Sequence, residues 1–304
     1  MLLLLEQVLN GLQLGVTLFL LAAGLTLVLG IMNLVNLAHG SLYMVGAFIA
    51  ATVARLTGSF LLGLAVALPA TALVGMLVEL VALRRLYERD HLDQVLATFG
   101  LILFFNELAR ILWGPRALFM DGPSWLSGTV EIIPGAPYPA YRLAIIGVGL
   151  AVALFLAWLN SRTRLGMLIR AGAANREMVA ALGVDIRRLY TLVFGLGAML
   201  AALAGVMAGP IYAVEVGMGE SILILTFVVI VIGGIGSTRG ALVGALLVGL
   251  VDTLGRAFLP GLLKVVLAPA TADGLGASLA SMAIYMLMAA VLIWRPRGLF
   301  PAPG

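Results

Sequence analysis

The chain has 304 residues, of which 62% are hydrophobic and only 11% are charged, with a formal net charge of +4. A soluble domain of this length is about half apolar and about a quarter charged, so the composition excludes an ordinary water-soluble protein and indicates a membrane protein. The absence of cysteine excludes disulfides and thiolate chemistry, and two histidines are too few for a His-based metal cluster, so we expect no bound metal.

The apolar runs predict an all-α, polytopic transmembrane helical bundle with about eight to ten membrane segments. A hydrocarbon core about 30 Å thick requires about 20 apolar residues per helix. For the run 219–235, a full span and a re-entrant or broken segment are both open. We expect residues 1–304 to form a single transmembrane domain. The runs cover residues 8–31, 41–56, 60–83, 95–113, 142–160, 189–212, 219–235, 240–259 and 278–294.

Arginines predict the orientation, because cytoplasmic loops carry an excess of basic residues. The clusters lie at residues 84–89, 162–188 and 295–297. Nine crossings place all three on one side, so this side is expected to be the cytoplasm of an inner membrane. The N-terminus is then outside, the C-terminus is cytoplasmic, and residues 114–141 and 260–277 form outer loops. Because the basic residues flank membrane runs in this way, the net charge does not indicate a nucleic-acid partner.

Polar residues inside or beside the apolar runs are candidates for the translocation path, because polar groups in a membrane are costly. Asn33, Asn36 and His39 follow one another at a spacing of three, which predicts one face of a helix continuing from the first run. A structural role at a helix break and a role in lining the path are both open for them. Thr98 in the fourth run and Glu215 near the outer mouth are further candidates. The carboxylate of Glu215 is suited to receive the ammonium group of an amino acid.

Other charged residues near the runs are interpreted as structural. Glu107 and Arg110 are expected to form an intrahelical ion pair, and so are Asp252 and Arg256. Glu79 is expected to snorkel to the inner membrane surface. The sequence GGIGSTRG, residues 233–240, predicts a helix break; it lacks the Lys of a phosphate-binding loop.

Residues 163–188, TRLGMLIRAGAANREMVAALGVDIRR, contain seven charged residues in 26 positions. Asn175 is suited to N-cap a helix with Glu177 in its first turn, and Gly183 to end it at the C′ position. The spacing therefore predicts a helix over 176–182, preceded by a second helical piece around 166–171.

Met178, Val179 and Leu182 are expected to form an apolar stripe on this short helix. A helix of two turns is unstable alone in water, so the stripe favours a docking surface for a cytoplasmic partner. The alternative is a basic inner loop that happens to be helical. The residues assigned to coupling are Gly166, Arg170, Asn175, Arg176, Glu177, Met178, Leu182, Gly183 and Asp185.

Four separated motifs resemble those of the branched-chain amino acid ABC-transporter permeases of the Liv type. They are NLVNLAHGSLYMVGA, the run from Gly166 to Asp185, VIGGIGSTRGALVGALLVGL and the ending RPRGLF. The sequence departs from the family pattern at Ser41, where family members often carry an acidic residue after the His-Gly pair. This departure weakens an exact assignment of the substrate.

The resemblance implies a helical permease that pairs with a second, homologous permease. It also implies two cytoplasmic ATP-binding subunits that receive the short helix within the segment 166–185, and a periplasmic substrate-binding protein. Because no GxxxxGK[ST] loop occurs, we expect ATP and Mg to be used by those subunits and no cofactor to be bound by this chain.

Three classes of function are open to a membrane protein of this kind. The permease subunit of an ABC importer for leucine, isoleucine and valine is favoured, with urea, short amides and aromatic acids as alternative substrates within the same family. A self-contained secondary transporter would need buried carboxylates near mid-membrane, which this chain almost lacks. A membrane enzyme would need a catalytic constellation, and none is visible, so we expect no enzymatic activity.

Overall fold

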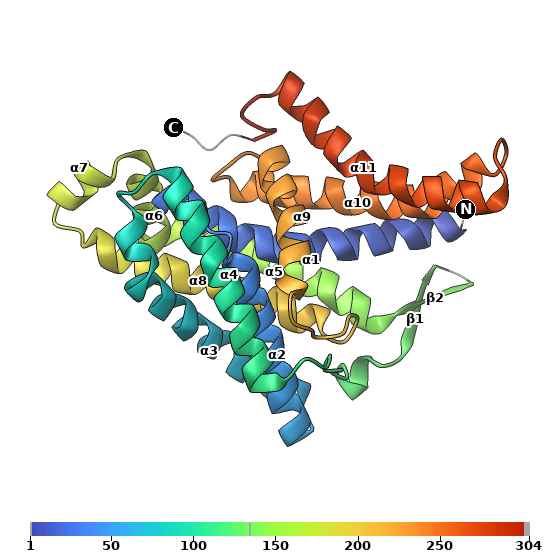
Figure 1. Ribbon diagram of the computed structural model, residues 1–304, viewed down its shortest axis with the longest axis horizontal. Coiled ribbons are helices and arrows are strands. Elements are labelled where there is room, and N and C mark those ends of the chain that lie inside the picture. Colours follow the sequence, from blue (N-terminus) through green and yellow to red (C-terminus); the bar gives the residue numbers. More distant parts are fainter. Residues whose placement is uncertain (1, 134, 301–304) are drawn as a thin grey trace.

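The computed structural model describes residues 2–133 and 135–300, which form a bundle of long apolar helices (Figure 1). Eight helices in this part of the chain are long and apolar enough to cross a membrane, which confirms the expected all-α polytopic bundle. The helices are α1 (Leu2–Met32), α2 (His39–Thr57), α3 (Phe60–Val81), α4 (His91–Trp113), α5 (Ala140–Arg162), α6 (Arg164–Ala174), α7 (Arg176–Ala181), α8 (Ile186–Ala208), α9 (Met218–Gly233), α10 (Thr238–Leu263) and α11 (Pro269–Trp294).

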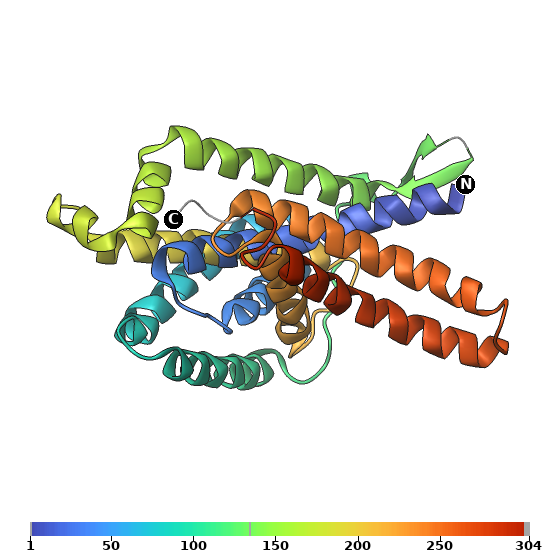
Figure 2. The same cartoon turned by 90° about the horizontal axis from the view of Figure 1, so that it is seen from above.

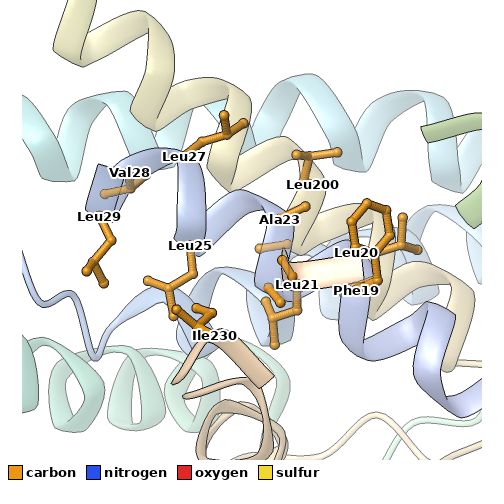
Figure 3. Close-up of a cluster of buried hydrophobic side chains, with 14 of the residues drawn as sticks. Phe19, Leu20, Leu21, Ala23, Leu25, Leu27, Val28, Leu29, Leu200 and Ile230 are labelled. Carbon is orange, nitrogen blue, oxygen red and sulfur yellow. The ribbon is translucent and has the colours of Figure 1, made fainter. Parts of the chain in front are cut away.

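The centre of the bundle is formed by α1, α2 and α8. Of the most apolar 18-residue stretch in each helix, 89% is buried in α1, 72% in α8 and 61% in α2, against 22–28% in the other long helices. Figure 3 shows α1 side chains such as Phe19 and Leu25 packed with Leu200 of α8 and Ile230 of α9. The other long helices therefore expose apolar side chains, as expected for surfaces that face lipid.

Small residues bring the central backbones close together. A Cβ atom added to Gly24 of α1 would lie 2.6 Å from the carbonyl oxygen of Gly197 in α8. A Cβ added to Gly40 at the start of α2 would lie 2.3 Å from the carbonyl oxygen of Gly219 in α9. Close approach at small residues is typical of membrane helices, where packing rather than hydrophobic burial drives association.

The chain between α1 and α2 is not helical, so the prediction that Asn33, Asn36 and His39 share one helix face was wrong, and the helix break that was left open is present instead. Asn33 adopts a positive φ of 50°, which ends α1. The Asn36 side chain accepts a hydrogen bond from the Ala38 amide at 3.0 Å, a local turn that competes with helix formation. His39 then begins α2 and is fully buried. The three side chains lie in a helix break rather than on one helix face.

A second break separates α9 from α10, as the glycine-rich sequence predicts. Gly234 has a φ of 105°, and Ser237 caps α10 by accepting a hydrogen bond from the Gly240 amide. The chain end packs here: the amides of Leu299 and Phe300 donate to the carbonyls of Ile232 and Gly233, each at 2.9 Å. These bonds satisfy carbonyl groups that the end of α9 would otherwise leave unpaired. The ending RPRGLF is thus in direct contact with the glycine-rich motif that begins at Val231.

Helix α9 has 16 residues and is about 24 Å long at 1.5 Å per residue, shorter than the hydrocarbon core of about 30 Å. Its first turn packs against the start of α2 inside the bundle, through the contact between Gly40 and Gly219. The length and this contact favour a broken segment over a full span.

The predicted outer loops contain more regular structure than expected. Most of 260–277 is helical, because α10 continues to Leu263 and α11 begins at Pro269, a favourable first position for proline. Within 114–141, β1 (Thr129–Ile133) and β2 (Ala136–Pro139) pair as an antiparallel hairpin. A separate backbone bridge joins Leu118 to Val214, which fixes this loop to the connection between α8 and α9.

The two ends of the bundle differ. Figures 1 and 2 both place the start of α1, the hairpin and the α10–α11 turn at one end. Helices α6 and α7 lie at the opposite end in both views. We call these the hairpin end and the α7 end.

Candidate functional site

Helix α7 is short and has strong caps at both ends. The Asn175 side chain accepts a hydrogen bond from the Met178 amide at 2.9 Å, which confirms the predicted N-cap. At the other end, Gly183 has a φ of 87°, and its amide donates to the carbonyl of Ala180. The Val184 amide donates to the carbonyl of Val179, completing a Schellman motif. The helix runs from Arg176 to Ala181, one residue shorter than predicted.

The apolar residues of α7 are not all on one face, contrary to the prediction. Val179 is only 6% exposed and packs against the bundle, whereas Met178 is 59% exposed and Leu182 is 77% exposed. Val179 therefore holds the helix in place. Met178 and Leu182, four residues apart, remain as an exposed apolar pair. Arg176 and Glu177 are also exposed.

Helix α6 fixes α7 to the transmembrane helices. A Cβ added to Gly166 would lie 2.1 Å from the carbonyl oxygen of Leu159, so only glycine lets α6 fold back onto the end of α5. Arg170 donates to the side chain of Asn160 at 3.3 Å, a further link between α6 and α5. On the other side, Asp185 caps α8 by accepting a hydrogen bond from the Arg188 amide. Helix α7 is therefore connected to α5 through α6 and to α8 through the Asp185 turn.

Glu79 joins three elements near the start of α8. It is fully buried, so the prediction that it snorkels was wrong. Its carboxylate accepts hydrogen bonds from Arg84 at 3.1 and 3.2 Å, from Tyr87 at 2.6 Å and from Thr191 of α8 at 2.7 Å. These partners replace water, which makes burial of the charge tolerable. Burial also raises the pKa of the Tyr87 hydroxyl well above its usual range, so it remains a donor.

A polar cavity of about 690 Å³ lies toward the hairpin end, between α1, α5, α9 and α10. The residues from α1 are mostly polar, whereas those from α9 are mostly apolar. Charged groups reach the cavity from α5, from α10 and from the connection between α8 and α9. The lining residues are Gln7, Asn10, Gln13, Leu14, Thr17, Tyr43, Arg142, Tyr212, Ala213, Glu215, Met218, Ser221, Ile222, Leu225, Asp252, Thr253, Arg256 and Ala257.

Of the residues predicted for the path, only Glu215 lines this cavity. Thr98 is buried in α4, and its hydroxyl donates to the carbonyl of Gln94 in the same helix at 2.8 Å. Asn33, Asn36 and His39 lie at the break between α1 and α2. The structure therefore does not bring the five predicted residues together.

Most of the cavity lining was not predicted from the sequence, although one signal was present. Gln7, Asn10, Gln13 and Thr17 recur at spacings of three, three and four, which places them on one face of α1. A polar stripe on a helix that is otherwise buried and apolar indicates a surface facing something other than lipid. Arg142 carried no such signal, because it lies near the start of its helix like many interfacial arginines.

Comparison with known proteins identifies the family. Residues 7–294 match the family described as the permease component of branched-chain amino acid transport systems. The chain belongs to this family. The permease is thus a multi-pass membrane protein, and its family is one of transport proteins rather than enzymes.

Individual relatives agree with this assignment. The permease is 31% identical to the high-affinity branched-chain amino acid transport system permease protein BraD of Pseudomonas aeruginosa, over 98% of this chain and 96% of the relative. It is also 31% identical to LivH of Escherichia coli, over 84% and 87% of the two chains. The autoinducer 2 import system permease LsrC of Klebsiella pneumoniae is 29% identical over 53% of this chain and 47% of its own length. No solved structure matches the chain significantly.

Proposed function

We propose that this permease is one membrane subunit of a binding-protein-dependent ABC importer for leucine, isoleucine and valine. It pairs with a second, homologous permease in the inner membrane. Two cytoplasmic ATP-binding subunits hydrolyse ATP with Mg, and a periplasmic binding protein delivers the substrate. The α7 end faces the cytoplasm, and the hairpin end faces the periplasm.

The observation that carries the proposal is the exposed, doubly capped helix α7. A helix of six residues is not stable by itself, yet it is held by both caps and by the burial of Val179. Met178 and Leu182 are left exposed beside Arg176 and Glu177. An exposed apolar pair with charged neighbours is suited to bind in a shallow cleft on a water-soluble partner. The family assignment supports an ATP-binding subunit as that partner.

The links of α7 to the bundle suggest how ATP hydrolysis moves the transmembrane helices. When the ATP-binding subunits close, α7 is displaced, and α6 transmits the movement to α5 through Gly166 and Arg170. The Asp185 cap transmits it to α8. Because α8 is central to the bundle, its tilt changes the space between this permease and its partner.

The test is ATP-driven uptake in proteoliposomes that contain the complete complex and its binding protein. Wild type takes up leucine, isoleucine and valine, whereas Glu177→Arg and Arg170→Glu retain assembly but lose most of the uptake per ATP hydrolysed. Matched charge reversals in the loop 114–141, Glu131→Arg and Arg116→Glu, leave uptake unchanged. Wild-type uptake in both variants, Glu177→Arg on α7 and Arg170→Glu on α6, overturns the coupling role. Uptake of urea, short amides or aromatic acids in place of the three amino acids overturns the substrate assignment.

A further inference from the structure

The polar cavity contains four charged side chains, two of which neutralise each other. Arg256 donates to the Asp252 carboxylate at 2.8 Å, within one helix. Arg256 also donates to the hydroxyl of Ser281 in α11 at 3.2 Å. This pair is therefore already compensated and is fixed against the neighbouring helix.

The other two charges, Arg142 and Glu215, have no ionic partner among the described residues. Arg142 donates to the amide oxygen of Asn10 at 2.6 Å, a neutral acceptor that orients the guanidinium without cancelling its charge. The Glu215 side chain makes no hydrogen bond within the same described residues, although its position is fixed by the bridge between Val214 and Leu118. The cavity thus presents one uncompensated positive and one uncompensated negative group.

The two charged groups come from different elements, and an apolar wall stands beside them. Arg142 extends from α5, whereas Glu215 lies on the connection between α8 and α9. Leu14 of α1 and Ile222 and Leu225 of α9 line the same cavity. Its volume of about 690 Å³ lies within the range of small-molecule sites.

We propose that this cavity is a transit site for a zwitterionic α-amino acid with an aliphatic side chain. Arg142 receives the carboxylate, because its positive charge is not cancelled by its neutral partner Asn10. Glu215 receives the ammonium group, and the aliphatic side chain packs against Ile222 and Leu225. The inference rests on the proposed function and adds to it the groups within the membrane that recognise the substrate.

The experiment measures leucine uptake and ATP hydrolysis in proteoliposomes with the complete complex and its binding protein. Arg142→Gln and Glu215→Gln are each expected to lower uptake about tenfold while ATP hydrolysis stays within about twofold of wild type. Arg142→Lys, which keeps the positive charge, restores most of the uptake. The matched controls are Arg110→Gln and Glu107→Gln, the same substitutions in an exposed ion pair on α4, and both retain wild-type uptake.

A second control separates recognition from folding. Tyr138→Phe removes a hydrogen bond to the same Asn10 oxygen without changing either charge, and we expect it to transport at the wild-type rate. Uptake within twofold of wild type for both Arg142→Gln and Glu215→Gln overturns the transit site. A loss in Arg142→Lys as large as in Arg142→Gln also overturns it, because charge would then not be the property required. Absence of branched-chain amino acid uptake by the wild-type complex is a different result, and it overturns the proposed function itself.

Discussion

At the scale of single residues, the structure gives charged groups three different roles. Glu79 is buried and bonded on both oxygens, Asp252 is paired within its helix, and Glu215 remains without a partner among the described residues. The sequence predicted the Asp252–Arg256 pair from its spacing and offered Glu215 as a free carboxylate, but it wrongly placed Glu79 at the membrane surface. The burial of Glu79 depends on Thr191, which is distant from it in sequence and close in the fold, together with the nearby Tyr87.

The Glu79 cluster leads to a prediction about stability. Glu79→Gln keeps the size of the side chain but removes the charge that accepts four hydrogen bonds, and it leaves Arg84 without its ionic partner. We expect a loss of about 2–3 kcal/mol, seen as a lower melting temperature of the purified complex in detergent. Glu107→Gln, in a pair with both side chains more than half exposed, should cost less than about 1 kcal/mol. Equal melting temperatures for the two variants would show that burial of Glu79 does not matter.

A second residue-scale prediction concerns the contact between α2 and α9. Gly219→Ala would place a Cβ 2.1 Å from the carbonyl oxygen of Gly40, so the two backbones must separate. We expect a clear loss of thermal stability and of assembled complex, judged by fluorescence-detected size-exclusion chromatography. Gly147→Ala is the control, because its Cβ would meet no atom within 4 Å. If both substitutions are tolerated equally, the backbones are not held in this close contact.

At the scale of elements, the sequence predicted helix ends and breaks correctly where these depend only on neighbouring residues. Asn175 and Gly183 located α7, and the glycines at 233–236 located the break before α10, because caps and left-handed positions depend on neighbouring residues. The interval from Asn33 to His39 was misread for the opposite reason. A spacing of three suits a helix, but the Asn36 side chain accepts a hydrogen bond from the Ala38 amide in a turn that is not helical. Which helices surround the polar cavity depends on tertiary packing and was not visible in the sequence.

The caps of α7 give a prediction at this scale. Asn175→Ala removes the N-cap at a cost of about 1 kcal/mol, and Gly183→Ala strains a left-handed position by about the same amount. In the double variant we expect α7 to fray and the uptake per ATP hydrolysed to fall several-fold. The melting temperature of the purified complex should stay at the wild-type value. Transport and hydrolysis assays on one preparation check this. A double variant that remains fully coupled would mean that α7 need not be helical to transmit force.

At the scale of the whole molecule, the two candidate sites lie toward opposite ends of a bundle whose centre is α1, α2 and α8 (Figure 2). Helix α7 connects to α8 through the Asp185 cap, and α8 continues to the connection that carries Glu215. Helix α8 therefore joins the segment proposed to contact the ATP-binding subunit to the segment that lines the cavity. This arrangement is what an ATP-driven importer requires.

The natural absence of cysteine makes the central claim directly testable, because one introduced cysteine is unique in the chain. We place it at Met178 on α7, and, as a control, at Val265, which is 83% exposed in the α10–α11 turn at the hairpin end. Thiol-to-amine crosslinking is then measured in inverted membrane vesicles that contain the complete complex. The account predicts a crosslink from position 178 to an ATP-binding subunit and none from position 265. No crosslink from position 178 in a complex that hydrolyses ATP and transports would contradict it.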